Sequence, residues 1–231
     1  MNSHANFSQP FVQPSSSSPC RFGGKFTGWK AQFACPKGKL GWLAGHLMAA
    51  KNAGMNRFAV EMLNLQPESQ LLEIGFGHGY GIQTAAKQMI TAHTTKGFIA
   101  GIDISGVMVH QAAKRNQHFI KSGLVELSQA SVANIPYEFA RFDRVLAVNN
   151  YQFWPNAEHN LTEIQRVLSK DGLLVLCLRL KESNRVFRLT PGFEEQEVEE
   201  AEGLLRWVGF RGIRLVKRRV GYQAACLIAQ K

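Results

Sequence analysis

The chain has 231 residues, of which 45% are hydrophobic and 19% charged, a composition that excludes collagen-like, coiled-coil and intrinsically disordered proteins. Lys and Arg number 27 against 17 Asp and Glu, and this net charge of +10 would suit nucleic acid, an anionic membrane or an anionic substrate as partner. By region the net charge is +5 over residues 1–70, +2 over 71–180 and +3 over 181–231. Because the central region is nearly neutral, the charge favours an anionic substrate, or a role in solubility, over a nucleic-acid partner.

Compartment and redox state are indicated by what the sequence lacks. No apolar run approaches the roughly 20 residues that span a bilayer, and residues 1–30 contain no signal-peptide-like block, which predicts a cytoplasmic protein without a membrane span. An organelle transit peptide stays open as an alternative, since residues 1–30 lack Asp and Glu. The cysteines have no zinc-ligand spacing, which predicts reduced thiols and no metal site. They are Cys20, Cys35, Cys177 and Cys226.

The first 66 residues divide into a tail and a helical preface. Residues 1–30 are rich in Ser, Pro and Gln, have no helical or strand periodicity, and are predicted to be a disordered tail. Over residues 31–66, apolar residues at helical spacing predict two short helices, with a break at Gly54 between them.

Residues 67–231 alternate between strand and helix patterns and are predicted to form one α/β domain. Runs such as Leu173–Leu178 have no polar alternation, as expected of parallel strands covered by helices on both faces. Such sheets bind ligands at the carboxyl ends of their strands. The strand candidates are Gln70–Ile74, Gly97–Ile102, Val125–Gln129, Phe142–Val148 and Leu173–Leu178, with helices near 80–92, 106–121, 156–169 and 194–208, and Gly212–Val220 with Gln223–Ala229 as a closing antiparallel pair.

The segment from Leu71 to Gly81 is the most informative part of the chain. A buried strand runs into a turn with glycine at every second position, so the main chain can adopt positive φ and lie directly against a ligand. The spacing excludes the dinucleotide pattern GxGxxG, and no Lys-Ser or Lys-Thr follows to complete a P-loop. Glu73 at the end of the strand would repel a pyrophosphate and attract an ammonium or sulfonium group.

Glu73-Ile74-Gly75-Phe76-Gly77-His78-Gly79 resembles the E/DxGxGxG loop of class I S-adenosylmethionine-dependent methyltransferases. Three later stretches are similar to motifs of the same family: Gly101-Ile102-Asp103-Ile104-Ser105, Asn134 to Val145, and Glu163 to Leu173. The resemblance covers about residues 68–180. It implies a Rossmann-like sheet of seven strands in the order 3-2-1-4-5-7-6, with strand 7 antiparallel, helices on both faces, and an N-terminal helical lid over residues 31–66.

The resemblance also implies which residues hold S-adenosylmethionine and release S-adenosylhomocysteine. The loop residues Glu73, Gly75, Phe76, Gly77 and Gly79 would approach the methionine part of the cofactor. Asp103 would accept hydrogen bonds from the ribose hydroxyls, and Ile104 would pack on the adenine. Ser131 and Val132 fall at the adenine edge, where Ser131 replaces an aspartate that is common in the family. These positions and Asn149 form the predicted cofactor site.

The acceptor side is less well defined, because methyl transfer depends mainly on positioning and does not require a general base. Residues 149–154 follow the fourth strand at the mouth of the sheet, and their aromatic side chains could hold a flat acceptor or pack under the next helix. Tyr151, together with His46 in the preface, is a weak candidate for a catalytic role. Asn149-Asn150-Tyr151-Gln152 lacks the two prolines of DNA amino-methyltransferases, which disfavours base methylation.

Three functions are compatible with the sequence, and the leading hypothesis is methyl transfer to a small-molecule acceptor. The preface from Pro36 to Asn56 resembles the leader of bacterial small-molecule methyltransferases of the quinone-biosynthesis type. Lys217-Arg218-Arg219 motivates an RNA or protein methyltransferase as the alternative, and Ser131 motivates a catalytically silent binding protein. The acceptor atom and the oligomeric state are not specified by the sequence.

Overall fold

The structure is a computed structural model that describes residues 53–90, 96–181 and 192–231. The predicted tail over residues 1–30, most of the predicted lid, and His46 lie outside the described residues. Within them, no helix is long and apolar enough to cross a membrane.

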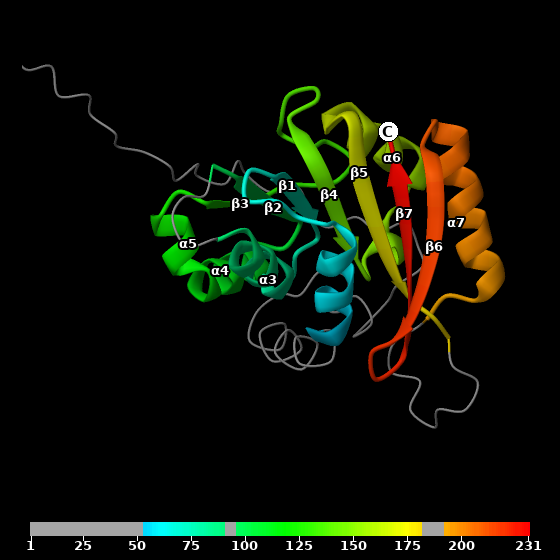
Figure 1. The fold of residues 1–231 in the computed structure, drawn as a ribbon, viewed down its shortest axis with the longest axis horizontal. Helices are drawn as coiled ribbons and strands as arrows, with labels where there is room; N and C mark the ends of the chain where they lie inside the picture. Colours follow the sequence, from blue (N-terminus) through cyan, green and yellow to red (C-terminus); the bar gives the residue numbers. More distant parts are fainter. Residues whose placement is uncertain (1–52, 91–95, 182–191) are drawn as a thin grey trace, which may run out of the picture.

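A seven-stranded sheet in the order β3-β2-β1-β4-β5-β7-β6 forms the centre of the molecule (Figure 1). β1 to β5 are mutually parallel, whereas β7 runs antiparallel to both β5 and β6. This confirms the predicted topology and the closing antiparallel pair. The strands are β1 Gln70–Ile74, β2 Phe98–Asp103, β3 Val125–Gln129, β4 Phe142–Val148, β5 Leu168–Arg179, β6 Arg211–Arg219 and β7 Gln223–Gln230.

Helices cover both faces of the sheet, so each face forms its own hydrophobic core. One core packs against a helix over residues 53–62 and against α3 Tyr80–Met89, α4 Gly106–Arg115 and α5 Gln117–Lys121. The other core packs against α6 Ala157–Val167 and α7 Glu195–Val208. The central strands are buried on both faces, which explains why their sequences show no polar alternation.

The structure differs from the predicted elements at three places. The helix expected over 106–121 is interrupted at Asn116, whose side chain is fully buried and bonds elsewhere in the fold. β5 begins at Leu168, earlier than expected, because Leu168 pairs with Phe142 of β4. The predicted break at Gly54 is wrong, since residues 53–62 are helical; a Cβ on Gly54 would lie 3.1 Å from the Cβ of Val220. Gly54 packs closely against Val220 as part of this helix.

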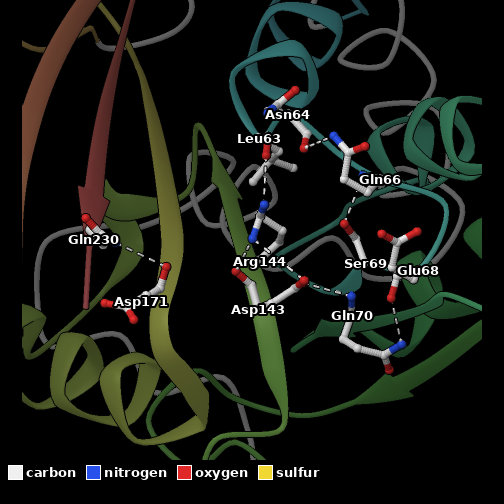
Figure 2. A network of polar contacts seen from close by, with 10 residues as sticks. All are labelled: Leu63, Asn64, Gln66, Glu68, Ser69, Gln70, Asp143, Arg144, Asp171 and Gln230. Atoms are coloured by element: carbon white, nitrogen blue, oxygen red, sulfur yellow. Dashed lines mark hydrogen bonds and ion pairs between the residues drawn. The ribbon is translucent and has the colours of Figure 1, made fainter.

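The helix over residues 53–62 is joined to the amino-terminal edge of the sheet by a network of polar contacts (Figure 2). The Arg144 guanidinium donates to the Leu63 carbonyl over 2.9 Å, and Asp143 accepts the backbone N–H of Gln70 over 2.8 Å. The Ser69 hydroxyl accepts the N–H of Gln66 over 2.9 Å. These contacts fix the start of β1 against β4 and leave the opposite edge of the sheet for the glycine loop.

Candidate functional site

The glycine loop joins β1 to α3 at the carboxyl edge of the sheet. Gly75, Gly77 and Gly79 all have positive φ, at 62°, 55° and 71°, a conformation that glycine adopts without steric cost. The Gly75 N–H donates to the Ile102 carbonyl of β2 over 2.7 Å, and the Gly79 N–H donates to the Phe76 carbonyl over 2.9 Å. The loop therefore folds over the ends of β1 and β2.

The three loop glycines have different surroundings. A Cβ on Gly75 would overlap the Asn150 amide, and one on Gly79 would lie 2.6 Å from the Asn116 amide nitrogen. A Cβ on Gly77 would meet nothing within 4 Å among the described residues. Gly75 and Gly79 thus allow close packing of the loop, whereas the Gly77 backbone faces open space in which a ligand can lie.

The outer side of the loop is held by two residues that the sequence analysis did not single out. The Asn116 amide donates to the Gly79 carbonyl over 3.0 Å and to the Ala112 carbonyl over 2.9 Å. The Arg115 guanidinium donates to the His78 carbonyl over 3.0 Å. The sequence contains one signal for these contacts with the loop: Asn116 is a polar residue in an otherwise helical pattern, and it follows Arg115.

Phe76 contributes to the site through its backbone, because its side chain is buried in the hydrophobic core. A Cβ on Gly101 of β2 would lie 2.7 Å from the Phe76 ring, so the ring packs directly on the β2 backbone. The ring therefore fixes the loop from beneath.

Asp103 ends β2 directly beside the glycine loop and is nearly buried. One carboxylate oxygen accepts the Gly77 N–H over 2.9 Å and the other accepts the Ser105 N–H over 2.8 Å. Burial raises the pKa of this carboxyl to about 6, although both hydrogen bonds oppose the shift. Each carboxylate oxygen has a second lone pair, so a diol could still donate to Asp103.

Glu73 is buried beneath the loop, with its carboxyl against the backbone of Gly81 at the start of α3. Its Oε2 has no hydrogen-bond partner among the described residues. Burial, together with the nearby charge of Asp103, raises the pKa of Glu73 to about 8. A buried acid in this condition is stabilised by a cationic group, which matches the sequence-based preference for an ammonium or sulfonium.

The end of β3 brings Ser131 and Val132 to the same edge. The Ala130 N–H donates to the Asp103 carbonyl over 3.1 Å, so the segment that follows β3 starts beside the acid. The Ser131 hydroxyl accepts the Ala133 N–H over 3.2 Å. Val132 is half-buried, while Ile104 is 37% exposed and presents apolar surface beside Asp103.

The segment after β4 carries three buried amide oxygens without partners. Asn149 has a φ of 52° and donates its N–H to the Cys177 carbonyl over 2.8 Å, while the Asn150 amide donates to the Ile74 carbonyl at the end of β1. The side-chain oxygens of Asn149, Asn150 and Gln152 have no hydrogen-bond partner among the described residues. Buried acceptors are normally satisfied, so this cluster indicates a ligand that brings hydrogen-bond donors.

Tyr151 lies in a short 3-10 helix, Tyr151–Phe153, within an aromatic cluster. Its ring centroid lies 5.2 Å from that of Trp154 and 6.0 Å from that of Phe193. Burial, with a smaller contribution from the charge of Glu200, raises the pKa of Tyr151 above its ordinary value of 10.0. The phenol therefore stays protonated at neutral pH, which argues against Tyr151 as a general base.

Comparison with known proteins shows which proteins the domain is similar to. Residues 72–176 match the family described as methyltransferase domain. An uncharacterized methyltransferase of Bacillus subtilis, YdaC, is 28% identical over 82% of this chain and 98% of its own length. The 2-methyl-6-phytyl-1,4-hydroquinone methyltransferase 1 of Oryza sativa is 27% identical to this chain. The alignment covers 57% of this chain and 41% of that protein.

Among solved structures, an S-adenosylmethionine-dependent methyltransferase from Aquifex aeolicus superposes with a TM-score of 0.62, at 20% identity. The superposition covers 76% of this chain and 88% of that one. Over residues 72–176, a little under half of its length, the chain is therefore similar to the methyltransferase domain family, and its fold is that of an S-adenosylmethionine-dependent methyltransferase.

Proposed function

We propose that this methyltransferase moves the methyl group of S-adenosylmethionine to a small-molecule acceptor at the carboxyl edge of its sheet. The observation that carries the proposal is the cluster of buried oxygen acceptors there that have no hydrogen-bond partner in the described part of the chain. The cluster lies next to the open backbone of Gly77 and consists of side-chain oxygens of Glu73, Asn149, Asn150 and Gln152. If the loops at this edge served only to reverse the chain, their buried acceptors would be expected to bond to donors of the protein itself.

The described residues fit the cofactor. Asp103 would accept the ribose hydroxyls, and the exposed part of Ile104 would support the adenine. The glycine loop and Asn149 would hold the methionine part, with Glu73 as counter-charge to its ammonium. Bound there, the cofactor supplies an electrophilic methyl group on a positively charged sulfur.

Methyl transfer is an in-line displacement at carbon. A bond forms between the acceptor's nucleophilic atom and the methyl carbon, the carbon–sulfur bond breaks, and its electron pair stays on sulfur to give a neutral thioether. A hydroxyl or amine acceptor also loses a proton. The main tasks of the chain are to orient both reactants and to exclude water, so the protonated Tyr151 fits a role as a wall of the site or as a hydrogen-bond donor.

The substitution at Ser131 does not require a catalytically silent protein. The Ser131 hydroxyl accepts one backbone N–H and has a second lone pair with which to accept the adenine amino group. The predicted consequence is weaker cofactor affinity than an aspartate would give, because a neutral acceptor replaces a charged one.

A small-molecule acceptor is favoured over RNA or protein by the distribution of charge. The net charge is only +2 over residues 71–180, the region that contains the glycine loop and the ends of β1 to β5. The likeness to the rice hydroquinone methyltransferase supports an acceptor of the quinone-biosynthesis type. A cytoplasmic location and the division into tail, lid over 31–66 and domain over 67–231 stay predictions.

The test is a screen of a metabolite extract with methyl-labelled S-adenosylmethionine, in which products are identified by mass. We expect the label in a low-molecular-weight compound, and Asp103→Ala serves as a control in which cofactor binding is weakened and labelling should fall. Label in the RNA or protein fraction would replace the small-molecule proposal with its alternative. Cofactor binding without transfer to any fraction would indicate a silent binding protein.

A further inference from the structure

A pocket opens at the carboxyl edge of the sheet, and no residue of the glycine loop lines it. It has a volume of about 620 Å³ and lies between the end of β5, the start of α7, and the facing ends of β6 and β7. These ends lie together at the lower right of Figure 1. The lining residues are Leu180, Lys181, Phe193, Glu194, Glu195, Lys217, Arg218, Arg219 and Gln223.

The wall of this pocket is set by backbone pairing. The Lys181 N–H donates to the Phe193 carbonyl, and the Phe193 N–H donates to the Arg179 carbonyl, each over 2.8 Å. These bonds hold the residues before α7 against the end of β5, so Leu180 and Phe193 line the pocket from a fixed position. The pocket is thus part of the folded sheet edge.

The charges around the pocket favour an anion. Four cationic side chains line it against two carboxylates, and one of the four, Arg218, is paired with Glu61, which does not line the pocket. Both carboxylates also stabilise the start of α7: Glu194 belongs to its capping box and Glu195 lies in its first turn. Both carboxylates would therefore still stabilise the start of α7 if Lys181 and Lys217 contacted a ligand in their place.

The ion pairs in the pocket are exposed. The Lys181 side chain is 53% exposed and pairs with Glu194, and the Lys217 side chain is 41% exposed and pairs with Glu195. Exposed pairs of this kind contribute little to stability, so an anionic group that contacts both lysines can displace them.

Aromatic packing connects the pocket to the acceptor side of the methyltransferase site. Phe193 lines the pocket and contacts Tyr151, whose segment carries the unpartnered amide oxygens after β4. A molecule with its anionic end among the lysines can lay an apolar body over Leu180 and Phe193 toward that segment.

We propose that this pocket binds the anionic end, a carboxylate or a phosphate, of an acceptor with an apolar body. The proposal rests on the proposed methyl transfer for the identity of the ligand as acceptor, whereas anion binding in the pocket can be measured independently. Lys181 and Lys217 bind the anion, and Phe193 packs against the apolar body.

The test is calorimetric titration of the full chain with three probes that share an aryl-alkyl body: 4-phenylbutyrate, 4-phenylbutyl phosphate and the neutral 4-phenylbutanol. We expect at least one anion to bind about tenfold more tightly than the alcohol, as charge-assisted hydrogen bonds contribute. Which anion binds more tightly distinguishes a carboxylate from a phosphate. Lys181→Gln/Lys217→Gln should abolish the preference for the anion.

The matched control is Arg206→Gln/Arg214→Gln, which also removes two exposed cations but lies outside the pocket lining. It removes one ion pair with glutamate, whereas the lysine variant removes two. The control should keep the preference for the anion. The proposal is overturned if the alcohol binds as tightly as both anions, if neither anion binds at millimolar concentration, or if the control loses the preference equally.

S-adenosylhomocysteine titrated into the same samples separates this proposal from the proposed function. Unchanged affinity for this product in both double variants shows that they are folded. Binding of the product without binding of either anion rejects the pocket and leaves methyl transfer intact. Anion binding without binding of the product supports the pocket as an anion site and rejects methyl transfer.

Discussion

The two edges of the sheet differ in how far their polar side chains are hydrogen-bonded. At the amino edge, Asp143, Arg144 and Ser69 bond to backbone groups of neighbouring segments (Figure 2). At the carboxyl edge, Glu73 and three amide oxygens are buried without partners among the described residues, and two carboxyl groups have raised pKa values. These amino-edge groups bond within the described part of the chain, whereas the groups at the carboxyl edge lack partners there, and we propose that a ligand supplies them.

This difference shows where folding and binding are separated in the molecule. Satisfied polar groups stabilise the fold, while buried unsatisfied groups lower its stability and raise its affinity for a molecule that supplies donors and positive charge. Substitutions at the amino edge should therefore change stability alone. Substitutions at the carboxyl edge should change cofactor affinity more than stability.

The largest expected effect comes from Asp103→Ala. Loss of a charged acceptor should weaken binding of S-adenosylhomocysteine by about 1–3 kcal/mol, measured by calorimetry. The matched control is Asp143→Ala, the same change at the amino edge, which should leave affinity unaltered. Equal affinities in wild type and Asp103→Ala would remove Asp103 from the cofactor site.

The glycine loop offers a comparison between two positions with similar backbone strain. Gly75→Ala and Gly77→Ala each place a side chain at positive φ, at an expected cost of about 1–2 kcal/mol in unfolding free energy. Only Gly75→Ala also collides with Asn150. Thermal unfolding should show the larger loss for Gly75→Ala, whereas Gly77→Ala should mainly reduce cofactor affinity, because its Cβ enters the open side of the loop. The reverse order would contradict the assignment of that side to the ligand.

The pH dependence of stability tests the state of Glu73. Its pKa is about 8 in the folded protein against an ordinary value of 4.5, so between these limits the folded state holds a proton that the unfolded state has lost. Without cofactor, the stabilising contribution is fully present below about pH 4.5 and is lost as the pH rises toward 8. Denaturant unfolding at several pH values should show this decline, and Glu73→Gln should flatten it between pH 6 and 8, above the range in which Asp103 also titrates. An unchanged slope in the variant would show that Glu73 is not the titrating group.

The smallest effect is expected at the amino edge. Asp143→Asn removes the charge that bonds the Gln70 N–H and lies 3.7 Å from the Arg144 guanidinium. Because the amide oxygen can still accept the N–H, unfolding free energy should fall by only about 0.5–1 kcal/mol, with cofactor affinity unchanged. A change in affinity would show that the two edges are energetically coupled.

The sequence predicted the sheet well because uninterrupted apolar runs are diagnostic of strands buried on both faces. The bounds of β1, β3 and β4 agree with those expected, as does the placement of Glu73 and Asp103 at strand ends. Asn116 was missed because the carbonyl that it bonds is 37 residues away in the chain. Gly54 was misread because its role depends on contact with Val220, which no local pattern reveals.

The most direct test of the account is calorimetric titration of the wild-type chain with S-adenosylmethionine near pH 7, in two buffers of different ionisation enthalpy. The cofactor's positive charge should lower the raised pKa values of Glu73 and Asp103, so we predict one site per chain with release of protons on binding. Absence of binding at millimolar cofactor, or binding without proton release, would contradict the claim that the buried acids at the carboxyl edge receive the cofactor.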